Sequence, residues 1–262
     1  MKTNSKNNSL TKKVLLSVVA AGVMSGFVLS AEAADSTLSV TSGEVTKSNV
    51  AVSDVVVTNA AKLILENSTV SGVEKERTYP NDTQIDVLRA ADVAADVRGA
   101  GSELTAKNVN FTGEVSAFEG AKISITGGSI TSANYYYKPG SYSYSGTVAE
   151  GMTRIGAYKN AQIELNNVNI KSNLDVYAGG IINVNDSNID GAVAIRAMGE
   201  KAVLNLKSSD GTATYGKAGL SAADGATINI DGGATILGGV SLSNAAKFNI
   251  KTGNVEIKGN DS

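Results

Sequence analysis

A short motif recurs along most of this chain, and it restricts the fold more than any other property of the sequence. Eight segments, from AAKLILENSTV to AAKFNIKTGNV, align on an apolar residue that has a second apolar residue two positions later and a small residue two positions earlier. The aligned residues are Leu63, Leu104, Ile123, Ile163, Ile182, Leu204, Ile228 and Phe248. Self-similarity with a period of about 20 residues is typical of proteins built from stacked repeats.

Each repeat contains three short segments in which apolar and polar residues alternate. One begins at the aligned residue, another lies eight to six residues before it, and a third apolar position follows seven residues after it in six of the eight repeats. Gly211 and Thr235 occupy that third position in the two exceptions. Alternation with period two puts successive side chains on opposite faces of a strand. The Gly, Asn, Asp and Ser residues between the segments favour tight bends, so the sequence predicts three strands per repeat.

These features predict an all-β chain folded as a parallel β-solenoid with coils of about 20 residues. The aligned residue and its second neighbour should point into the core, and the small residue before them should lie at a tight corner. The residue between them should face outward, where Asn183, Asn205, Asn229 and Asn249 could stack as a ladder of amides. An antiparallel sandwich is the rival fold, but it needs longer strands paired by hairpins. No segment keeps a helical period of 3.6 residues over three turns.

Two of the intervals between aligned residues, 63 to 104 and 123 to 163, are close to 40 residues rather than 20. We expect each to hold a degenerate coil together with an insertion, near residues 72–99 and 134–150. The whole chain then contains nine or ten coils. At about 4.8 Å per coil, the rod should be on the order of 45 Å long.

The N-terminus has the three-part layout of a secretory signal peptide. Four lysines precede an apolar stretch at 14–29, and the small-residue site Ala31-Glu32-Ala33 follows it. This pattern predicts a signal peptide over residues 1–33, cleaved between Ala33 and Ala34. A short membrane anchor is the alternative, although the apolar stretch is shorter than the roughly 20 residues that a membrane-spanning helix needs. The β-helix domain then occupies residues 34–262.

The composition excludes several classes of function. The chain has no Cys and no His, which rules out disulfides, thiolate zinc sites, a Ser-His-Asp triad and a histidine pH switch. Its formal charge of −2 provides no basic surface for nucleic acid. The sequence therefore predicts no nucleic-acid partner, and it suggests neither a metal site nor a cofactor.

The insertion near 134–150 is rich in tyrosine, and it is the candidate ligand-binding segment. Five of the nine tyrosines of the chain fall within NYYYKPGSYSYSG. They are Tyr135, Tyr136, Tyr137, Tyr142 and Tyr144. Tyrosine offers a large rigid ring with a hydroxyl group, which suits contacts with sugars or protein surfaces. The alternative is that these rings fold back and cover the neighbouring coil.

The insertion near 72–99 carries mixed charges, which are most simply explained as a solvated face. Its segment VLRAADVAADV could form a short amphipathic helix against the rod. Asp92, Asp96 and Arg98 form the one grouping in the chain that suggests carbohydrate chemistry, because β-helical polysaccharide lyases and hydrolases use clustered carboxylates. The roles of such carboxylates depend on their separation in space.

The signal peptide, the short strands rich in Asn, Gly, Ser and Thr, and units such as GAKISITGGSITS and NAAKFNIKTGNVEIKG resemble the passenger domains of bacterial autotransporters, in particular those of the pertactin-like adhesin type. The resemblance covers most of residues 35–262. It implies a right-handed parallel β-helix presented at the cell surface by a C-terminal outer-membrane β-barrel. This chain ends in a segment that reads as another coil, so that translocator would lie outside this sequence.

The resulting expectation is an exported, non-catalytic rod, secreted or displayed at the bacterial outer membrane, that presents loops to an extracellular glycan or protein ligand. The alternative from another class is a secreted β-helical polysaccharide lyase or glycoside hydrolase. A carboxylate cluster on one face of the stack would favour that enzyme. A third reading is a purely structural component of the cell surface, in which neither insertion binds anything.

Overall fold

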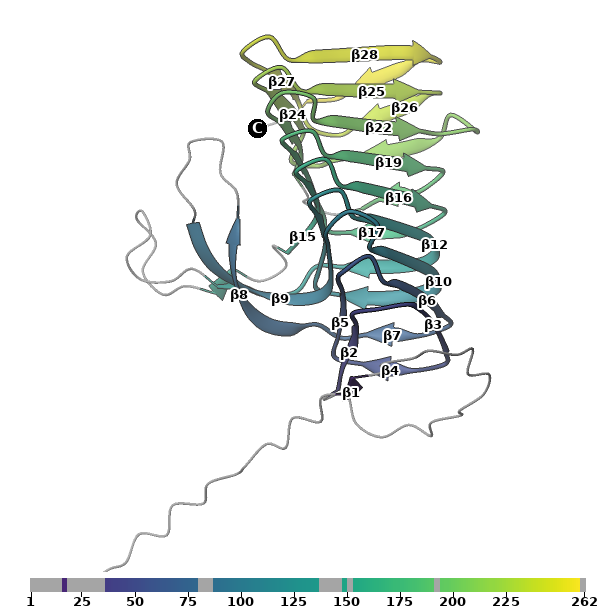
Figure 1. The fold of residues 1–262 in the computed structure, drawn as a ribbon. Helices are drawn as coiled ribbons and strands as arrows, with labels where there is room; N and C mark the ends of the chain where they lie inside the picture. Colours follow the sequence, from purple (N-terminus) through teal and green to yellow (C-terminus); the bar gives the residue numbers. More distant parts are fainter. Residues whose placement is uncertain are drawn as a thin grey trace, which may run out of the picture.

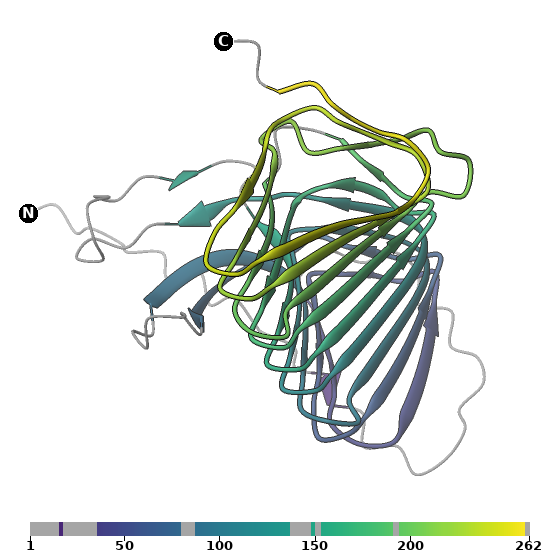
Figure 2. The same ribbon diagram turned by 90° about the horizontal axis from the view of Figure 1, so that it is seen from above.

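The computed structural model describes residues 16–17, 36–79, 87–136, 148–149, 153–190 and 194–259, and they form a parallel β-solenoid of about nine turns. Strands of successive coils lie above one another along the rod (Figure 1), and the view along its axis shows the coils superposed (Figure 2). The predicted fold class is therefore confirmed, with about 21 residues per turn and three parallel sheets.

The first sheet has the order β1-β2-β5-β9-β11-β15-β18-β21-β24-β27. Its strands are β1 (Leu16–Ser17), β2 (Thr37–Val40), β5 (Asp54–Val57), β9 (Val87–Arg98), β11 (Glu114–Phe118), β15 (Arg154–Tyr158), β18 (Asn173–Tyr177), β21 (Ile195–Met198), β24 (Leu220–Ala223) and β27 (Val240–Leu242). The second sheet comprises β3 (Glu44–Ser48), β6 (Lys62–Glu66), β10 (Glu103–Thr112), β12 (Lys122–Thr131), β16 (Gln162–Asn166), β19 (Ile181–Asn185), β22 (Val203–Lys207), β25 (Thr227–Asp231) and β28 (Lys247–Thr252).

The third side of the rod is divided in two. The long strands β10 and β12 bend round from the second sheet and pair there with short strands, while a separate sheet follows towards the C-terminus. The short strands are β4 (Ala51–Val52), β7 (Thr69–Val70), β17 (Asn169–Lys171) and β20 (Asn188–Ile189), and the separate sheet is β23 (Ala213–Tyr215), β26 (Ala234–Ile236) and β29 (Val255–Ile257). In the described residues β20 does not pair with β23, so the ladder is interrupted between these two strands.

The core follows the predicted register. Seven of the eight aligned residues, from Leu63 to Ile228, are at most 2% exposed, and their second neighbours are equally buried. The last coil differs, because Ile250 is 50% exposed. Two repeats have Gly211 and Thr235, rather than an apolar residue, at the predicted third inward position. In these repeats β23 and β26 begin at Ala213 and Ala234, and the inward position shifts to those residues.

The corners use left-handed backbone, as the small and polar residues predict. Asn67, Asn167 and Asp186 have φ angles of 48 to 54° at the corner between the second sheet and the third side. At the corner before the second sheet, a side chain at Gly180 would lie 2.3 Å from the carbonyl oxygen of Ala157. Close approach of the backbone therefore excludes a side chain at Gly180, whereas the other repeats have Ala or Ser at this position, fully buried in all but the last coil.

The predicted amide ladder is present. Asn205 Nδ2 donates to Asn183 Oδ1 at 2.7 Å, Asn229 Nδ2 donates to Asn205 Oδ1 at 2.8 Å, and Asn249 Nδ2 donates to Asn229 Oδ1 at 2.9 Å. All the amides point the same way, so each coil donates to the coil on its N-terminal side. Equal stacking distances and in-register pairing are what such a ladder needs.

Two expectations about the long intervals are wrong. Leu63 pairs directly with Leu104, and Ile123 with Ile163, so neither interval holds an additional degenerate coil. The segment VLRAADVAADV is strand β9 rather than a helix. Its apparently helical spacing arises at a β-bulge, where the register shifts between Glu114 and Val115 of the paired strand. One extra residue between two alternating runs mimics the three-and-four spacing of a helix.

Candidate functional site

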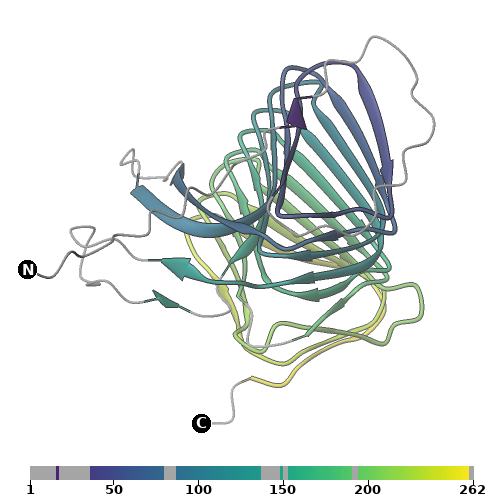
Figure 3. The same ribbon diagram turned by 90° about the horizontal axis from the view of Figure 1, so that it is seen from below.

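The two insertions, which are separated by residues 100–133 in the sequence, meet in one small antiparallel sheet beside the rod, which we call the side sheet. It consists of β8 (Val73–Tyr79), β9, β13 (Tyr135–Tyr136) and β14 (Val148–Ala149). Strand β9 belongs to both structures, because it pairs in parallel with β5 and β11 of the first sheet and antiparallel with β8 and β13. The side sheet projects laterally from the rod (Figures 1 and 3).

The predicted tyrosine site is only partly within the described residues. Tyr135 and Tyr136 form β13, where they pair with Ala91 and Ala90 of β9. Tyr137, Tyr142 and Tyr144 lie outside the described residues, as do Ala33 and Ala34 of the predicted cleavage site. A binding role for these tyrosines therefore stays a prediction.

Asp92 fixes the second insertion to the side sheet. Its Oδ2 accepts a hydrogen bond from the backbone N–H of Asn134 at 3.1 Å, and its own N–H donates to the carbonyl of Asn134 at 3.0 Å. Asp96 and Arg98 lie further along β9, where the Arg98 Nε is 2.9 and 3.1 Å from the two carboxylate oxygens. The three residues share a strand, where the contacts of Asp92 join the two insertions and the Arg98–Asp96 pair lies within β9.

Sequence reasoning missed a larger cluster on the outer face of the first sheet, which we call the charged face. Its four carboxylates, Asp54, Asp96, Glu114 and Asp175, are buried although they point away from the solenoid core. Asp54 accepts from the Thr37 hydroxyl at 2.6 Å and forms an ion pair with Lys75. Glu114 accepts from the Ser116 hydroxyl at 2.7 Å.

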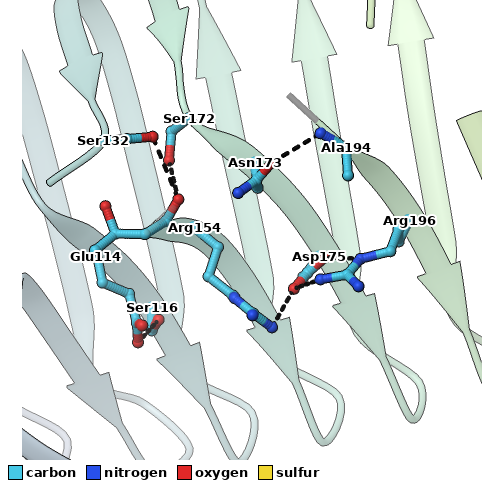
Figure 4. Close-up of polar contacts among 10 residues, drawn as sticks. Glu114, Ser116, Ser132, Arg154, Ser172, Asn173, Asp175, Ala194 and Arg196 are labelled. Carbon is cyan, nitrogen blue, oxygen red and sulfur yellow. Dashed lines mark hydrogen bonds and ion pairs between the residues drawn. The ribbon is translucent and has the colours of Figure 1, made fainter. Parts of the chain in front are cut away.

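Asp175, on β18, lies between two arginines on β15 and β21, the two strands that flank β18 (Figure 4). Its Oδ2 is 2.6 Å from Arg154 Nη1, while Arg196 binds both oxygens, through Nε at 2.8 Å and Nη2 at 2.9 Å. The Asp175 side chain is fully buried, and those of Arg154 and Arg196 are 14% and 34% exposed. Bidentate guanidinium–carboxylate contacts are among the strongest polar contacts in proteins.

An aromatic stack runs beside these charges. The rings of Phe118, Tyr158 and Tyr177 lie on three successive coils, with centroid separations of 4.8 and 5.7 Å and interplanar angles of 12°. The guanidinium of Arg98 covers the Phe118 ring at 4.3 Å. Burial raises the pKa of the Tyr158 hydroxyl well above its usual value, and the charges of Asp175 and Glu114 raise it further. Recurrence of aromatic residues at one register position was the sequence signal that could have revealed this face.

The described contacts of the charged face are hydrogen bonds and ion pairs. Glycosidases need one carboxyl group that gives up a proton and a second that acts on the sugar or on water. Here each of the four carboxylates already accepts from a Ser or Thr hydroxyl, from Lys75 or from an arginine. Among the described residues, no group of three or more acidic side chains is placed to hold a metal ion.

A polar groove lies on the third side, where the ladder is interrupted. It has a volume of about 620 Å³, and its lining spans five coils, from Gly128 to Leu237. The exposed polar side chains along it are those of Asn167, Asn169, Asp186, Asn188 and Asp190. The N–H and hydroxyl of Ser209 donate to Asp186 Oδ1 and lower the pKa of that carboxyl group. Amide and carboxylate groups along an open groove can hydrogen-bond the hydroxyl groups of a sugar chain.

Comparisons with known proteins add no relative. No family model matches the chain, and no curated protein or solved structure is similar enough to count as a match. In the part of the chain that the structure describes, no helix is long and apolar enough to cross a membrane.

Proposed function

We propose that this chain is an exported bacterial β-solenoid that binds an extracellular glycan or protein through its side sheet, in the manner of an adhesin-type passenger. The observation that carries the proposal is the convergence of both insertions on β9. A binding segment gains affinity when it is held in one arrangement before the ligand arrives. Strand β9 provides this, since it continues without a break from the stacked core into the side sheet.

Export and surface location complete the proposal. The N-terminal layout predicts removal of residues 1–33, and the resemblance to autotransporter passengers implies a translocator in the outer membrane that lies outside this sequence. The groove on the third side offers a second set of contacts to a glycan. Its two aspartates favour a neutral sugar chain over an anionic one, because like charges in a shared groove repel.

The test compares attachment by cells that display the chain with attachment by cells that display variants. Changing Tyr137, Tyr142 and Tyr144 to serine should reduce attachment at least tenfold and leave thermal unfolding unchanged. The matched control changes Lys62 and Glu103, a solvent-exposed ion pair on the second sheet, to serine. Undiminished attachment by the tyrosine variant would rule out the tyrosine-rich insertion as the binding segment.

A secreted polysaccharide-degrading enzyme is the second candidate, and the four carboxylates on one outer face are what favours it. Incubation of the exported chain with soluble uronate-containing and neutral polysaccharides tests this directly. New reducing ends or unsaturated uronates, lost in the Glu114→Gln variant, would support the enzyme over the adhesin.

A further inference from the structure

The groove on the third side lies where one coil is longer than its neighbour. The coil from Leu204 to Ile228 has four more residues than the coil that follows it. It contains a turn in which Asp210 Oδ1 accepts from the Ser208 hydroxyl at 2.9 Å and from the Thr212 N–H at 3.0 Å. Among the described strands, β20 and β23 on either side of this turn do not pair. The groove is therefore built by the course of the backbone.

The asparagines of the groove take no part in a ladder. Asn169 on β17 and Asn188 on β20 are exposed and lie in register on adjacent coils. A matched pair on β16 and β19 of the second sheet does bond, because Asn185 Nδ2 donates to Asn166 Oδ1 at 2.9 Å. In the described part of the chain, neither the Asn169 nor the Asn188 side chain has a hydrogen-bond partner. Their donors and acceptors are therefore available to a ligand.

The aspartates of the groove supply further acceptors. Asp186 and Asp190 precede and follow β20, and both are exposed. The Ser209 N–H and hydroxyl hold Asp186 Oδ1 at 2.7 and 2.8 Å, which orients the carboxylate. The same two donors lower the pKa of the Asp186 carboxyl group, so it stays ionised at neutral pH. An ionised carboxylate only accepts hydrogen bonds, so it suits ligands that carry hydroxyl donors.

The lining also indicates which ligands do not fit. None of the described lining residues is positively charged, so an anionic ligand finds no counter-charge beside the two aspartates. The apolar lining residues Val168 and Ile189 are at most 3% exposed, which leaves little surface for an apolar ligand. They also form no pockets for the alternate side chains by which an extended peptide is recognised. A neutral ligand with many hydroxyl groups matches the amides and carboxylates best.

The shape of the groove favours a linear ligand. Its lining runs over five successive coils, from Gly128 to Leu237. At a spacing of about 4.8 Å between coils, this is a length of about 19 Å along the rod. Its volume of about 620 Å³ lies within the usual range for binding sites of small ligands.

We propose that this groove binds a linear, uncharged oligosaccharide segment that lies along the rod axis. Asn169 and Asn188 would bond its hydroxyl groups from the floor of the groove, and Asp186 and Asp190 from its edge. The inference rests on the proposed function for the presence of a glycan partner, but it assigns the glycan to a different site. No described lining residue belongs to the side sheet.

Isothermal titration calorimetry of the exported chain tests the proposal. The probes are cellohexaose, laminarihexaose and N-acetylchitohexaose, with hexagalacturonate as an anionic probe of equal length. We expect at least one neutral hexasaccharide to bind, and its affinity to exceed that of the corresponding disaccharide because it fills more of the groove. Hexagalacturonate should bind roughly tenfold more weakly. Changing Asp186 and Asp190 to asparagine should reduce that difference.

Two matched double variants identify the site. Asn169→Ala with Asn188→Ala should weaken binding of the neutral hexasaccharide about tenfold and leave thermal unfolding unchanged, because these side chains have no hydrogen bond to lose in the described structure. Asn166→Ala with Asn185→Ala should do the reverse. It removes a bond between coils and so lowers the melting temperature, while binding stays the same.

The outcome is independent of the test of the tyrosine-rich insertion. Changing Tyr137, Tyr142 and Tyr144 to serine should not alter hexasaccharide binding, so either site can fail without the other. Three results would each overturn the present proposal. They are no binding of any neutral hexasaccharide, equal affinity for hexagalacturonate, and an equal loss of binding in the two asparagine variants.

Discussion

Replacing Asp175 with asparagine should destabilise the middle of the rod, because this carboxylate neutralises two arginines at once. The substitution keeps the size of the side chain and one acceptor oxygen but removes the negative charge. Arg154 and Arg196, on the two strands that flank β18, would then lack this shared counter-charge, at a position where Asp175 itself has no contact with solvent.

The size of the effect follows from burial. Removing one partner of a buried ion pair costs about 3 to 5 kcal/mol. Arg196 is 34% exposed, so water screens part of its charge and the lower end of that range applies. We therefore expect Asp175→Asn to reduce the free energy of unfolding by about 3 kcal/mol. Replacing all three residues with apolar side chains of similar volume should recover most of the loss.

Hydrogen exchange read by mass spectrometry is the suitable assay, because repeat proteins can open locally without unfolding as a whole. Amides of β15, β18 and β21 should lose protection in Asp175→Asn, whereas those of β3 and β6, on coils close to the N-terminus, should not change. A matched substitution, Asp190→Asn in the exposed groove, controls for loss of a surface charge. A cost below about 1 kcal/mol in the Asp175 variant, comparable to a surface pair, would refute the reasoning from burial.

Three further predictions concern packing, pH and the amide ladder. Gly156→Ala would place a methyl group 2.3 to 2.6 Å from atoms of the Tyr158 side chain, whose ring is held in a stack and cannot easily move. We expect this change to lower the free energy of unfolding, measured with denaturant, by about 1 to 3 kcal/mol. Burial raises the pKa of the Tyr215 hydroxyl, so this group stays protonated in the folded chain at a pH where it ionises in the unfolded chain, near pH 10. The free energy of unfolding should therefore fall as the pH rises above about 10. In Tyr215→Phe this fall should be less steep. Asn205→Ala removes two ladder hydrogen bonds and should lower stability by about 1 kcal/mol, twice the effect of Asn249→Ala, as measured by thermal melting.

The stacked core could be predicted from the sequence because the solenoid repeats one local pattern. Leu63, Ile123 and Ile228 each sit in the same short context, so each independently reports an inward position next to a corner. The amide ladder follows from the same register. Local patterning and global fold agree in these coils, and this consistency is why a single sequence sufficed.

The sequence indicated the two insertions, but the side sheet and the charged face escaped prediction because they depend on contacts between coils and insertions. Nothing near Asp92 in the sequence announces Asn134 as its partner, and the bulge in β9 disguised a strand as a helix. Arg154, Asp175 and Arg196 belong to three different repeats, so their ion pairs appear only when the coils are placed in register. The outward positions of a solenoid tolerate many residue types, and a pattern of period two carries little information about them.

The dual membership of β9 has a mechanical consequence. A tension applied to the side sheet along β9 would enter the rod through one continuous backbone, without passing through a flexible hinge. The hydrogen bonds of β9 to β5 and β11 lie across that direction, so such a tension loads many of them simultaneously in shear and does not open them one after another. A rod anchored at one end and pulled through this strand would resist detachment as a unit, with the force shared between the coils on either side.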